Sequence, residues 1–324
     1  MQPTYTAEAE AYREKVQAFL AEKLPSNWQG TGALEGQELE DFVAEWRTVL
    51  YEANYLAPGW PAEYGGGGLS ALEQVILAEE FTKSGVPSGG PNDAFSIQML
   101  GNTLLMWGTD EQKEYYLPRL LKGDDVWCQG YSEPNAGSDL GNVGLKAELD
   151  GDEWILNGQK IWTSAGHLAD HIFTLARTDP DGPKHKGISF LLVPMDQPGI
   201  EVRPIKMISG DSEFNEVFYT DARVPKENVV GGVNNGWAVA MSLLGFERGE
   251  AAATGPIRFQ AEVDRLMEMA KERGLTDDPV IRQKLAWCHS KVQVMKYLGM
   301  RTLTQFLAGH HPGPDAALGK LCWS

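Results

Sequence analysis

The chain has 324 residues, 42% of them hydrophobic and 23% charged, so it is long enough for two or three domains and able to build a core. Its 45 acidic residues exceed its 28 basic ones and give a net charge of −17, which disfavours nucleic acid and anionic membrane surfaces as partners. No apolar run has membrane-spanning length, so we expect no membrane span. Three widely separated cysteines favour a reducing, cytoplasmic location over a disulfide framework.

The first third of the sequence predicts helices, because its apolar residues recur at helical spacing. Ser70 with Glu73, and Thr109 with Gln112, each form a capping box that predicts the start of a helix. The glycine run at 65–68 predicts a loop. The apolar positions with helical spacing are Tyr12, Val16, Phe19 and Leu20, and then Leu39, Phe42, Val43, Trp46 and Leu50.

From about residue 124 to residue 231 the pattern changes to short β-type segments separated by turn signals. Asp150-Gly151 lies between two such segments and predicts a hairpin. Asn157-Gly158 and Asp181-Gly182 predict further turns. We therefore expect an antiparallel sheet between two helical regions.

Helical periodicity returns after Gly236. It predicts helices over 238–253, 258–271 and 279–307, and a further helix that begins at Asp315. The expected fold class is α+β, with an N-terminal helical domain (1–123), a central antiparallel β domain (124–231) and a C-terminal helical bundle (232–324). We expect this bundle to be incomplete, because the chain stops inside its last predicted helix.

Familiar catalytic and metal-binding motifs are mostly absent. There is no Walker loop, HExxH or CxxC motif, and the six histidines are scattered, so we expect no metal site. Ser138 and Ser164 lack the G-x-S-x-G context of a hydrolase nucleophile. Taken alone, these residues indicate only a soluble, acidic, enzyme-like protein of α–β–α order.

Four segments, in order along the chain, resemble the acyl-CoA dehydrogenase family. They are WPAEYGG at 60–66, YSEPNAGSD at 131–139, NGQKIWTS at 157–164, and RVPKENVV at 223–230 followed by GW at 236–237. The resemblance implies FAD as cofactor, an acyl-CoA thioester as substrate, a trans-2-enoyl-CoA as product and an electron-transferring flavoprotein as acceptor. Two alternatives remain open. One is a flavin oxidase or monooxygenase on the same scaffold, and the other is a non-catalytic subunit that completes a partner's flavin site.

The resemblance assigns the cofactor to the second and third of these segments. A flavin needs hydrogen-bond donors at the edge where charge develops on reduction, and the loop at 131–139 offers backbone N–H groups and hydroxyls. Ser132 would face the flavin, Ser138 would contact a phosphate or the acyl-CoA, and Gly137 would permit close backbone approach. The alternative is an ordinary turn with serine caps. Tyr131, which opens the loop, is included in the cofactor site.

In the third segment, Trp162 would stack on the flavin in a cleft shared with the C-terminal helices. Thr163 and Ser164 follow it, and the Ser164 hydroxyl would bond flavin N5. The alternative is a core tryptophan on a strand, which is the commoner use of this residue.

The same resemblance places the catalytic base on the helix after the β domain. Glu247 follows Leu243 and Leu244 by four and three residues, so it shares their apolar face. It would take the α proton, while Phe246 and Arg248 would shape the acyl-CoA site. The alternatives are a partly exposed glutamate, or a base in a segment or partner outside this chain.

One segment departs from the usual family pattern. Family members usually carry Arg-x-x-Phe-Gly where this chain has ERGLTDDP at 272–279. This resembles a bacterial branch, some of whose members act on steroid or other bulky acyl-CoAs as mixed tetramers with shared flavin sites. We expect a homo- or hetero-oligomer, because helix faces with Val292, Met295 and Leu298 need cover.

Overall fold

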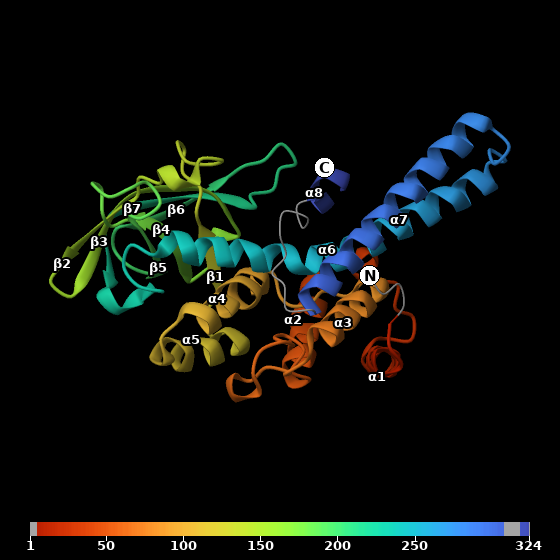
Figure 1. Cartoon of the computed structure of the whole chain (residues 1–324), viewed down its shortest axis with the longest axis horizontal. Helices are drawn as coiled ribbons and strands as arrows, with labels where there is room; N and C mark the ends of the chain where they lie inside the picture. The colour runs from red at the N-terminus through yellow and green to blue at the C-terminus, as the bar shows by residue number, and fades with distance from the viewer. Residues whose placement is uncertain (1–4, 308–317, 324) are drawn as a thin grey trace. The chain divides into compact units, whose positions relative to one another are not determined.

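The computed structural model describes residues 5–307 and 318–323, without the side chains of residues 246–253, 306–307, 319–320 and 323. The chain divides into two compact units. The first comprises residues 1–59, 67–88 and 247–324, and the second residues 60–66 and 89–246. The helix α6 (Gly236–Glu272) begins in the second unit and ends in the first (Figure 1).

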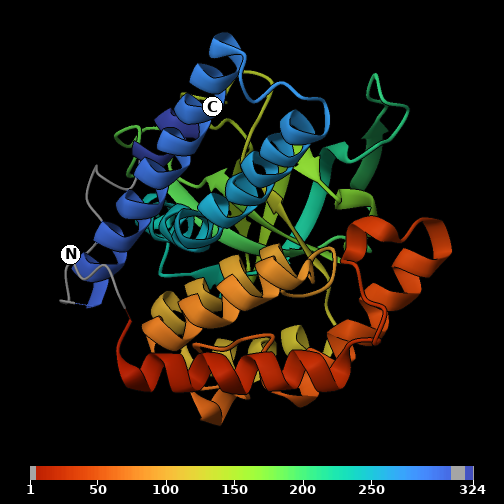
Figure 2. The same cartoon turned by 90° about the vertical axis from the view of Figure 1, so that its right-hand side faces the viewer.

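The regular secondary structure in the described part of the first unit is helical. Thr6 caps α1, and the capping box of Ser70 and Glu73 opens α3, as predicted. In Figure 2, α1 lies alongside α3, and their contact buries Val16, Leu20 and Ile76. Besides the end of α6, the helices are α1 (Ala7–Lys23), α2 (Gly36–Glu52), α3 (Ala71–Ser84), α7 (Pro279–Leu307) and α8 (Leu318–Trp323), with a 3-10 turn at Thr31–Ala33.

A buried charge network joins α1 to α3. Arg13 on α1 pairs with Glu80 and, at 2.8 Å from its Nη2, with Glu79 of α3. Gln17 and Lys83 also donate to Glu80, at 2.9 Å and 2.6 Å. The Glu80 side chain is only 5% exposed and that of Arg13 12%. Removal of the Arg13 or the Glu80 charge therefore leaves the remaining charge poorly hydrated and without its main partner, which destabilises the folded state.

The second unit begins with helices that lead into a sheet. Thr109 and Gln112 form the predicted capping box of α5, and the Gln112 amide also donates to the carbonyls of Glu227 and Val229. Pro118 lies inside α5 without ending it. The elements are η2 (Ala62–Tyr64), the π-helix η3 (Ala94–Gly101), α4 (Asn102–Trp107) and α5 (Asp110–Lys122).

Among the described residues the sheet has eight strands in the order β6-β7-β3-β2-β4-β5-β8, with β1 beside β4. It is mostly antiparallel, which confirms the predicted type of sheet, and it contains two parallel pairings: β1 runs parallel to β4, and β2 meets β4 in parallel at one position. β1 and β4 can run parallel because the β2–β3 hairpin separates them in the sequence, so that β4 enters the sheet beside β1 in the same direction. The strands are β1 (Trp127–Gly130), β2 (Lys146–Asp150), β3 (Glu153–Ser164), β4 (His171–Arg177), β5 (Ile188–Pro194), β6 (Ile200–Ile205), β7 (Phe214–Pro225) and β8 (Val229–Val230). Short 3-10 turns lie at Leu140–Asn142, Gly166–Leu168 and Lys226–Asn228.

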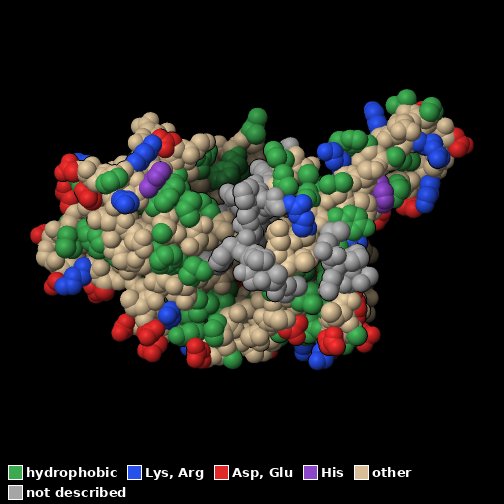
Figure 3. All heavy atoms as spheres, viewed as in Figure 1, with side chains coloured by type: hydrophobic (Ala, Val, Ile, Leu, Met, Phe, Trp, Pro, Cys, Tyr) green, Lys and Arg blue, Asp and Glu red, His purple; other side chains and the backbone are tan. Residues whose placement is uncertain are grey.

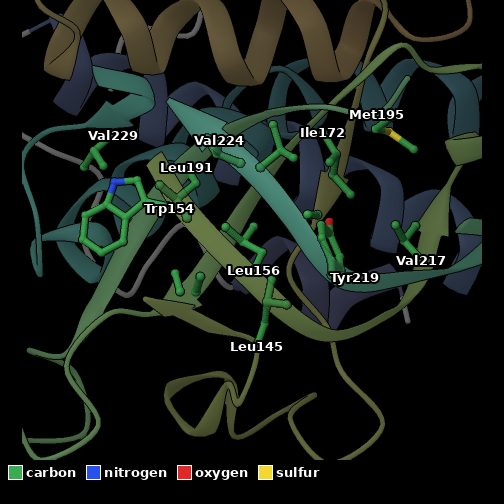
Figure 4. Packing of buried hydrophobic residues seen from close by; sticks show 14 of the residues in the cluster. Leu145, Trp154, Leu156, Ile172, Leu191, Met195, Val217, Tyr219, Val224 and Val229 are labelled. Carbon is green, nitrogen blue, oxygen red and sulfur yellow. The ribbon is translucent and has the colours of Figure 1, made fainter. Parts of the chain in front are cut away.

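One face of this sheet forms a hydrophobic core (Figure 4). Its side chains come from strands that are far apart in the sequence, because alternate residues of each strand point to the same face. The labelled members are Leu145, Trp154, Leu156, Ile172, Leu191, Met195, Val217, Tyr219, Val224 and Val229.

The predicted turns have different outcomes. The hairpin is confirmed, with Gly151 at φ 64° between Asp150 and Glu153. Asn157-Gly158 is no turn: it lies within β3 as a bulge against β7, and the Asn157 side chain exchanges hydrogen bonds with Asp221. Asp181-Gly182 does turn the chain between β4 and β5, where both amides donate to Asp179.

The C-terminal prediction needs one correction. Residues 238–253 and 258–271 belong to a single helix, because α6 continues through Pro256. A proline has no N–H to donate and its ring crowds the preceding turn, but burial of Thr254 and Val263 on either side supports the helix through that position. The helix at 279–307 is confirmed as α7. Residues 310–314 and Asp315 lie outside the described residues.

The fold class is confirmed as α+β. The secondary structure changes type between Lys122 and Trp127, and again between Val230 and Gly236. The two boundaries that the sequence predicts between its three domains stay a prediction.

Candidate functional site

The loop at 131–139 leaves the sheet where β1 ends at Gly130. The Tyr131 ring is buried edge-on against Phe173 and Phe190, which fixes the start of the loop. Glu133 and Ala136 exchange backbone hydrogen bonds of 3.0 Å and close a tight turn. Beyond this turn Gly137 and Ser138 are exposed, and a Cβ added to Gly137 would meet no atom within 4 Å.

The loop is tied to strand β3 by backbone and side-chain bonds. The N–H of Ile161 donates to the Ser132 carbonyl at 2.9 Å. The Lys160 ammonium donates to the Tyr131 carbonyl at 3.2 Å and to Glu133 Oε1 at 2.7 Å. The second and third motif segments are therefore neighbours in the fold, and Ser132 lies beside the strand that carries Trp162.

Lys160 is a site residue that the sequence reasoning missed. It is completely buried, and burial lowers its pKa to about 8, against the opposing effect of the nearby Glu133 carboxylate. A period-two pattern places position 160 on the buried side, but nothing in the sequence names Glu133 as its partner. The pair therefore emerges only from the fold.

Trp162 occupies an unusual backbone conformation on β3. The register with β7 shifts between Lys160 and Thr163, and Trp162 has φ 61°, in the left-handed region that bulky side chains avoid. Its side chain is 57% exposed and meets Phe214 edge-on. The core-tryptophan alternative is therefore wrong. A strained, exposed aromatic is typical of a functional site.

The two residues after Trp162 provide hydroxyl groups at the end of β3. Thr163 is 1% exposed, and among the described residues its Oγ1 has no hydrogen-bond partner. Its carbonyl accepts the Asn215 amide at 2.9 Å, whereas the Asn215 Oδ1 is likewise buried without a described partner. Ser164 is half-buried. Unmatched polar atoms of this kind are suited to a polar ligand.

A second loop, between β4 and β5, packs against the end of the motif. The Arg177 guanidinium donates to the carbonyls of Gly141 and Lys184, both at 2.8 Å. The Lys184 ammonium pairs with Asp139 at 2.6 Å, and the next residue, His185, stacks on Trp237. These cationic groups beside Ser138 were not predicted from the sequence, since no motif marks the loop.

The proposed base and its two neighbours lie on the helix that follows the sheet. Phe246, Glu247 and Arg248 belong to helix α6, but their side chains lie outside the described part of the structure. Leu243 is fully buried, as its apolar face predicts. The roles of the three residues, like the cleft expected around Trp162, stay predictions.

Other kinds of site find no support among residues 5–307 and 318–323. No group of three His, Cys, Asp or Glu side chains there could hold a metal ion. None of the described helices is long and apolar enough to cross a membrane.

An exposed indole, an unmatched hydroxyl group with an unmatched amide oxygen nearby, and a tightly held loop with open space above its glycine together fit a planar aromatic ligand with polar edges. The chain matches the acyl-CoA dehydrogenase N-terminal domain over residues 6–124, the middle domain over 128–222 and the C-terminal domain over 234–324. The fold and these three matches thus define the class of the protein as an oxidoreductase scaffold of the acyl-CoA dehydrogenase type.

Among its relatives, the acyl-CoA dehydrogenase IpdE1 of Mycobacterium tuberculosis is 41% identical over 321 residues, which cover 98% of this chain and 82% of that protein. Among solved structures, the Tcur3481-Tcur3483 steroid ACAD matches with a TM-score of 0.83 and 34% identity over 99% of this chain and 82% of its own. The ChsE4-ChsE5 complex from Mycobacterium tuberculosis matches with a TM-score of 0.80 and 32% identity, with the same coverages. The chain belongs to the acyl-CoA dehydrogenase family, which confirms the family predicted from its motifs.

Proposed function

We propose that the protein is an FAD-dependent dehydrogenase that converts an acyl-CoA thioester into its trans-2-enoyl-CoA. The observation that carries this proposal is Trp162, an exposed indole held in a strained backbone conformation beside the unmatched Thr163 hydroxyl. A protein gains nothing in stability from either feature, whereas a stacked aromatic ligand would use both.

The chain's own residues then have distinct tasks. When bound, the flavin would accept a hydride from the β carbon of the acyl group. Glu247 would take the α proton on its carboxylate, while Phe246 and Arg248 shape the surrounding acyl-CoA site. Tyr131 and Ser132 would hold the cofactor through the loop backbone, and Thr163 and Ser164 would donate hydrogen bonds at its edge. Gly137 would leave room for it, and Ser138 would contact a phosphate or the substrate.

The direct test is a visible absorption spectrum of the purified protein, alone and with its candidate partner subunit, followed by anaerobic addition of a panel of acyl-CoAs. We expect a flavin spectrum that bleaches with at least one acyl-CoA. A protein that neither retains nor takes up FAD in either state would contradict the proposal.

The acyl group that we propose is bulky and derived from a steroid. Support comes from the segment at 272–279 and from the likeness to a steroid ACAD. The panel should therefore contain a steroid side-chain acyl-CoA and straight-chain acyl-CoAs of several lengths. Faster bleaching by the straight chains would reject the bulky substrate while leaving the dehydrogenase proposal intact.

The electron acceptor separates the dehydrogenase from an oxidase or monooxygenase. We propose an electron-transferring flavoprotein as acceptor. Reoxidation of the reduced protein by O₂ within the time of a turnover would favour the oxidase, whereas slow reoxidation that the flavoprotein accelerates would favour the dehydrogenase. A chain that binds FAD only together with a partner that supplies the base would be the non-catalytic subunit.

Replacement of Trp162 by Gly should stabilise the protein and weaken its hold on FAD. The left-handed backbone costs a bulky residue about 1–3 kcal/mol, more than the roughly 0.5–1 kcal/mol that glycine adds in chain entropy. We expect the free energy of unfolding of the FAD-free variant to exceed that of the FAD-free wild type by about 1 kcal/mol. We expect its FAD dissociation constant to be about fivefold to tenfold higher than that of the wild type, since a stacked aromatic pair is worth about 0.5–1.5 kcal/mol.

Two further variants separate strain from stacking. Trp162→Ala keeps the Cβ and loses the ring, so it should weaken FAD binding without the gain in stability. Trp162→Phe should retain most of the affinity. If all three variants bind FAD as tightly as the wild type does, Trp162 is not part of the cofactor site.

The reason given above for oligomerisation needs correction, although the oligomer itself stays a proposal. Val292 and Met295 are buried within the helical unit, so they need no further cover. Three of the exposed apolar residues of α7, Val280, Trp287 and Val294, recur every seven residues and so form one stripe, and Tyr297 is exposed as well. Figure 3 shows hydrophobic side chains among the charged ones along the α6–α7 hairpin.

The change Trp287→Lys with Val294→Lys should dissociate the assembly. A buried interface aromatic contributes about 2 kcal/mol or more, so we expect association to weaken by at least about tenfold. Light scattering at micromolar concentration measures the mass of the wild type and the variant. His289→Ala, an exposed change on the same helix, is the control. A monomeric wild type would contradict the proposal of an oligomer. An oligomeric mass in the variant equal to that of the wild type would show that this stripe is not the interface.

A further inference from the structure

We infer that the buried Lys160–Glu133 pair is the positioning device that fixes the peptide after Tyr131, so that the Ser132 N–H is turned to meet the cofactor. The inference rests on the proposed function for the identity of that cofactor. Neither residue would touch the reacting atoms, and both act through the loop they hold.

Lys160 reaches the loop from the interior of the sheet. Its side chain is fully buried on β3, two residues before Trp162. The ammonium donates to Glu133 Oε1 at 2.7 Å and to the Tyr131 carbonyl at 3.2 Å. One side chain therefore fixes both a carboxylate and a main-chain oxygen of the motif loop.

Glu133 extends this hold to the far end of the segment. Its Oε2 accepts the Gly144 N–H at 2.6 Å, and its Oε1 accepts the Leu145 N–H at 2.9 Å. Those two residues lead directly into β2. The carboxylate thus joins the start of the loop, the strand β3 and the point where the chain re-enters the sheet.

The direction of the Ser132 N–H follows from peptide geometry. In a trans peptide the C=O and the next N–H point in opposite directions. The Tyr131 carbonyl points to Lys160, so the Ser132 N–H is turned away from Lys160. The Ile161 N–H holds the following carbonyl, that of Ser132. A donor fixed before the ligand arrives loses no freedom on binding, which strengthens its contribution.

Packing alone does not account for the pair. A buried ion pair loses hydration on both groups, and hydrophobic side chains of similar volume often replace one without loss of stability. Burial also lowers the lysine pKa to about 8, a sign of that cost. The contribution of the pair lies instead in the main-chain contacts that a hydrophobic pair cannot make.

The experiment compares Lys160→Met with the double variant Lys160→Met/Glu133→Gln, and with Arg223→Met as a control from an exposed ion pair on β7. The single variant leaves a buried carboxylate unpaired, so it should lose both thermal stability and FAD affinity. The double variant removes that charge and should regain most of the stability. Its FAD dissociation constant should nevertheless stay about tenfold above that of the wild type, because the Tyr131 carbonyl has lost its donor.

Hydrogen exchange in the FAD-free protein gives a readout independent of the cofactor. The amides of Gly144, Leu145 and Ile161 should exchange about tenfold faster in Lys160→Met. Amides of the β4–β5 pairing should keep their wild-type rates, as should every amide near the loop in Arg223→Met.

The outcomes distinguish this inference from the proposed function. Failure of the wild type to bind FAD would reject the proposed function, while the exchange data would still test whether the pair holds the loop. Wild-type FAD affinity in the double variant would overturn the inference, since each charge of the pair would then only neutralise the other and would not position the loop. Unchanged exchange at Gly144, Leu145 and Ile161 in Lys160→Met would overturn it as well.

Discussion

Replacement of Glu247 by Gln should lower the rate of flavin reduction by acyl-CoA by about 10²–10⁴-fold, the usual contribution of a general base. Glutamine keeps the size of the side chain and its hydrogen bonds but has no basic oxygen. Departure of the β hydride depends on removal of the α proton, so the whole reductive step should slow. Rapid anaerobic mixing, with the flavin absorbance followed over time, measures this rate.

If Glu247 is the base, its replacement should slow proton removal and leave the binding of FAD and acyl-CoA unchanged. Glu247→Gln should retain a normal flavin spectrum and bind acyl-CoA as tightly as the wild type, because neither property needs the carboxylate to act as a base. Glu262→Gln is a matched control, since Glu262 is an exposed glutamate on the same helix. Bleaching at close to the wild-type rate would place the base elsewhere, in a partner subunit or in another segment.

Features set by neighbours in the sequence could be predicted, and those set by distant partners could not. The capping boxes at Ser70 and Thr109 join residues three apart, and both form as expected. Asn157-Gly158 has the composition of a turn, yet it becomes a bulge because Asp221 holds the Asn157 side chain across 64 residues. The local sequence shows the asparagine, but it does not show that Asp221 will lie beside it in the fold.

The candidate site divides in the same way. The motifs predict that Ser132 and Trp162 belong to one site, and the Ile161–Ser132 hydrogen bond makes their segments neighbours. The strained conformation of Trp162 could not be foreseen, because it arises from a register shift between β3 and β7. Lys160 was overlooked because a lysine in a strand normally indicates the solvent side. Its burial depends on two partners that are distant in the sequence, the carboxylate of Glu133, 27 residues away, and the carbonyl of Tyr131.

Replacement of Arg13 by Met should lower the free energy of unfolding by about 3 kcal/mol, the lower end of the range for breaking a buried ion pair. Methionine fills a similar volume but leaves Glu79 and Glu80 with less positive charge nearby. Lys83 and Gln17 still contact Glu80, and the Tyr5 hydroxyl still donates to Glu79, which keeps the loss at this lower end. Urea denaturation at neutral pH measures it. In Arg203→Met, whose ion pair with Glu201 is more than half exposed, we expect a change within about 1 kcal/mol.

The effect of Arg13 should also depend on pH, with a sign that the Glu80 carboxyl determines. Burial raises its pKa, but the hydrogen bonds from Lys83, Gln17 and Arg13 outweigh burial and hold the pKa below its usual value. A carboxyl with a depressed pKa stabilises the folded state above its unfolded pKa, and this contribution is lost as the pH falls through the folded pKa. The gap in stability between wild type and Arg13→Met should therefore be widest near neutral pH and narrow in acid. A gap of constant size from neutral pH into acid would mean that Arg13 stabilises the contact of α1 with α3 by packing rather than by charge.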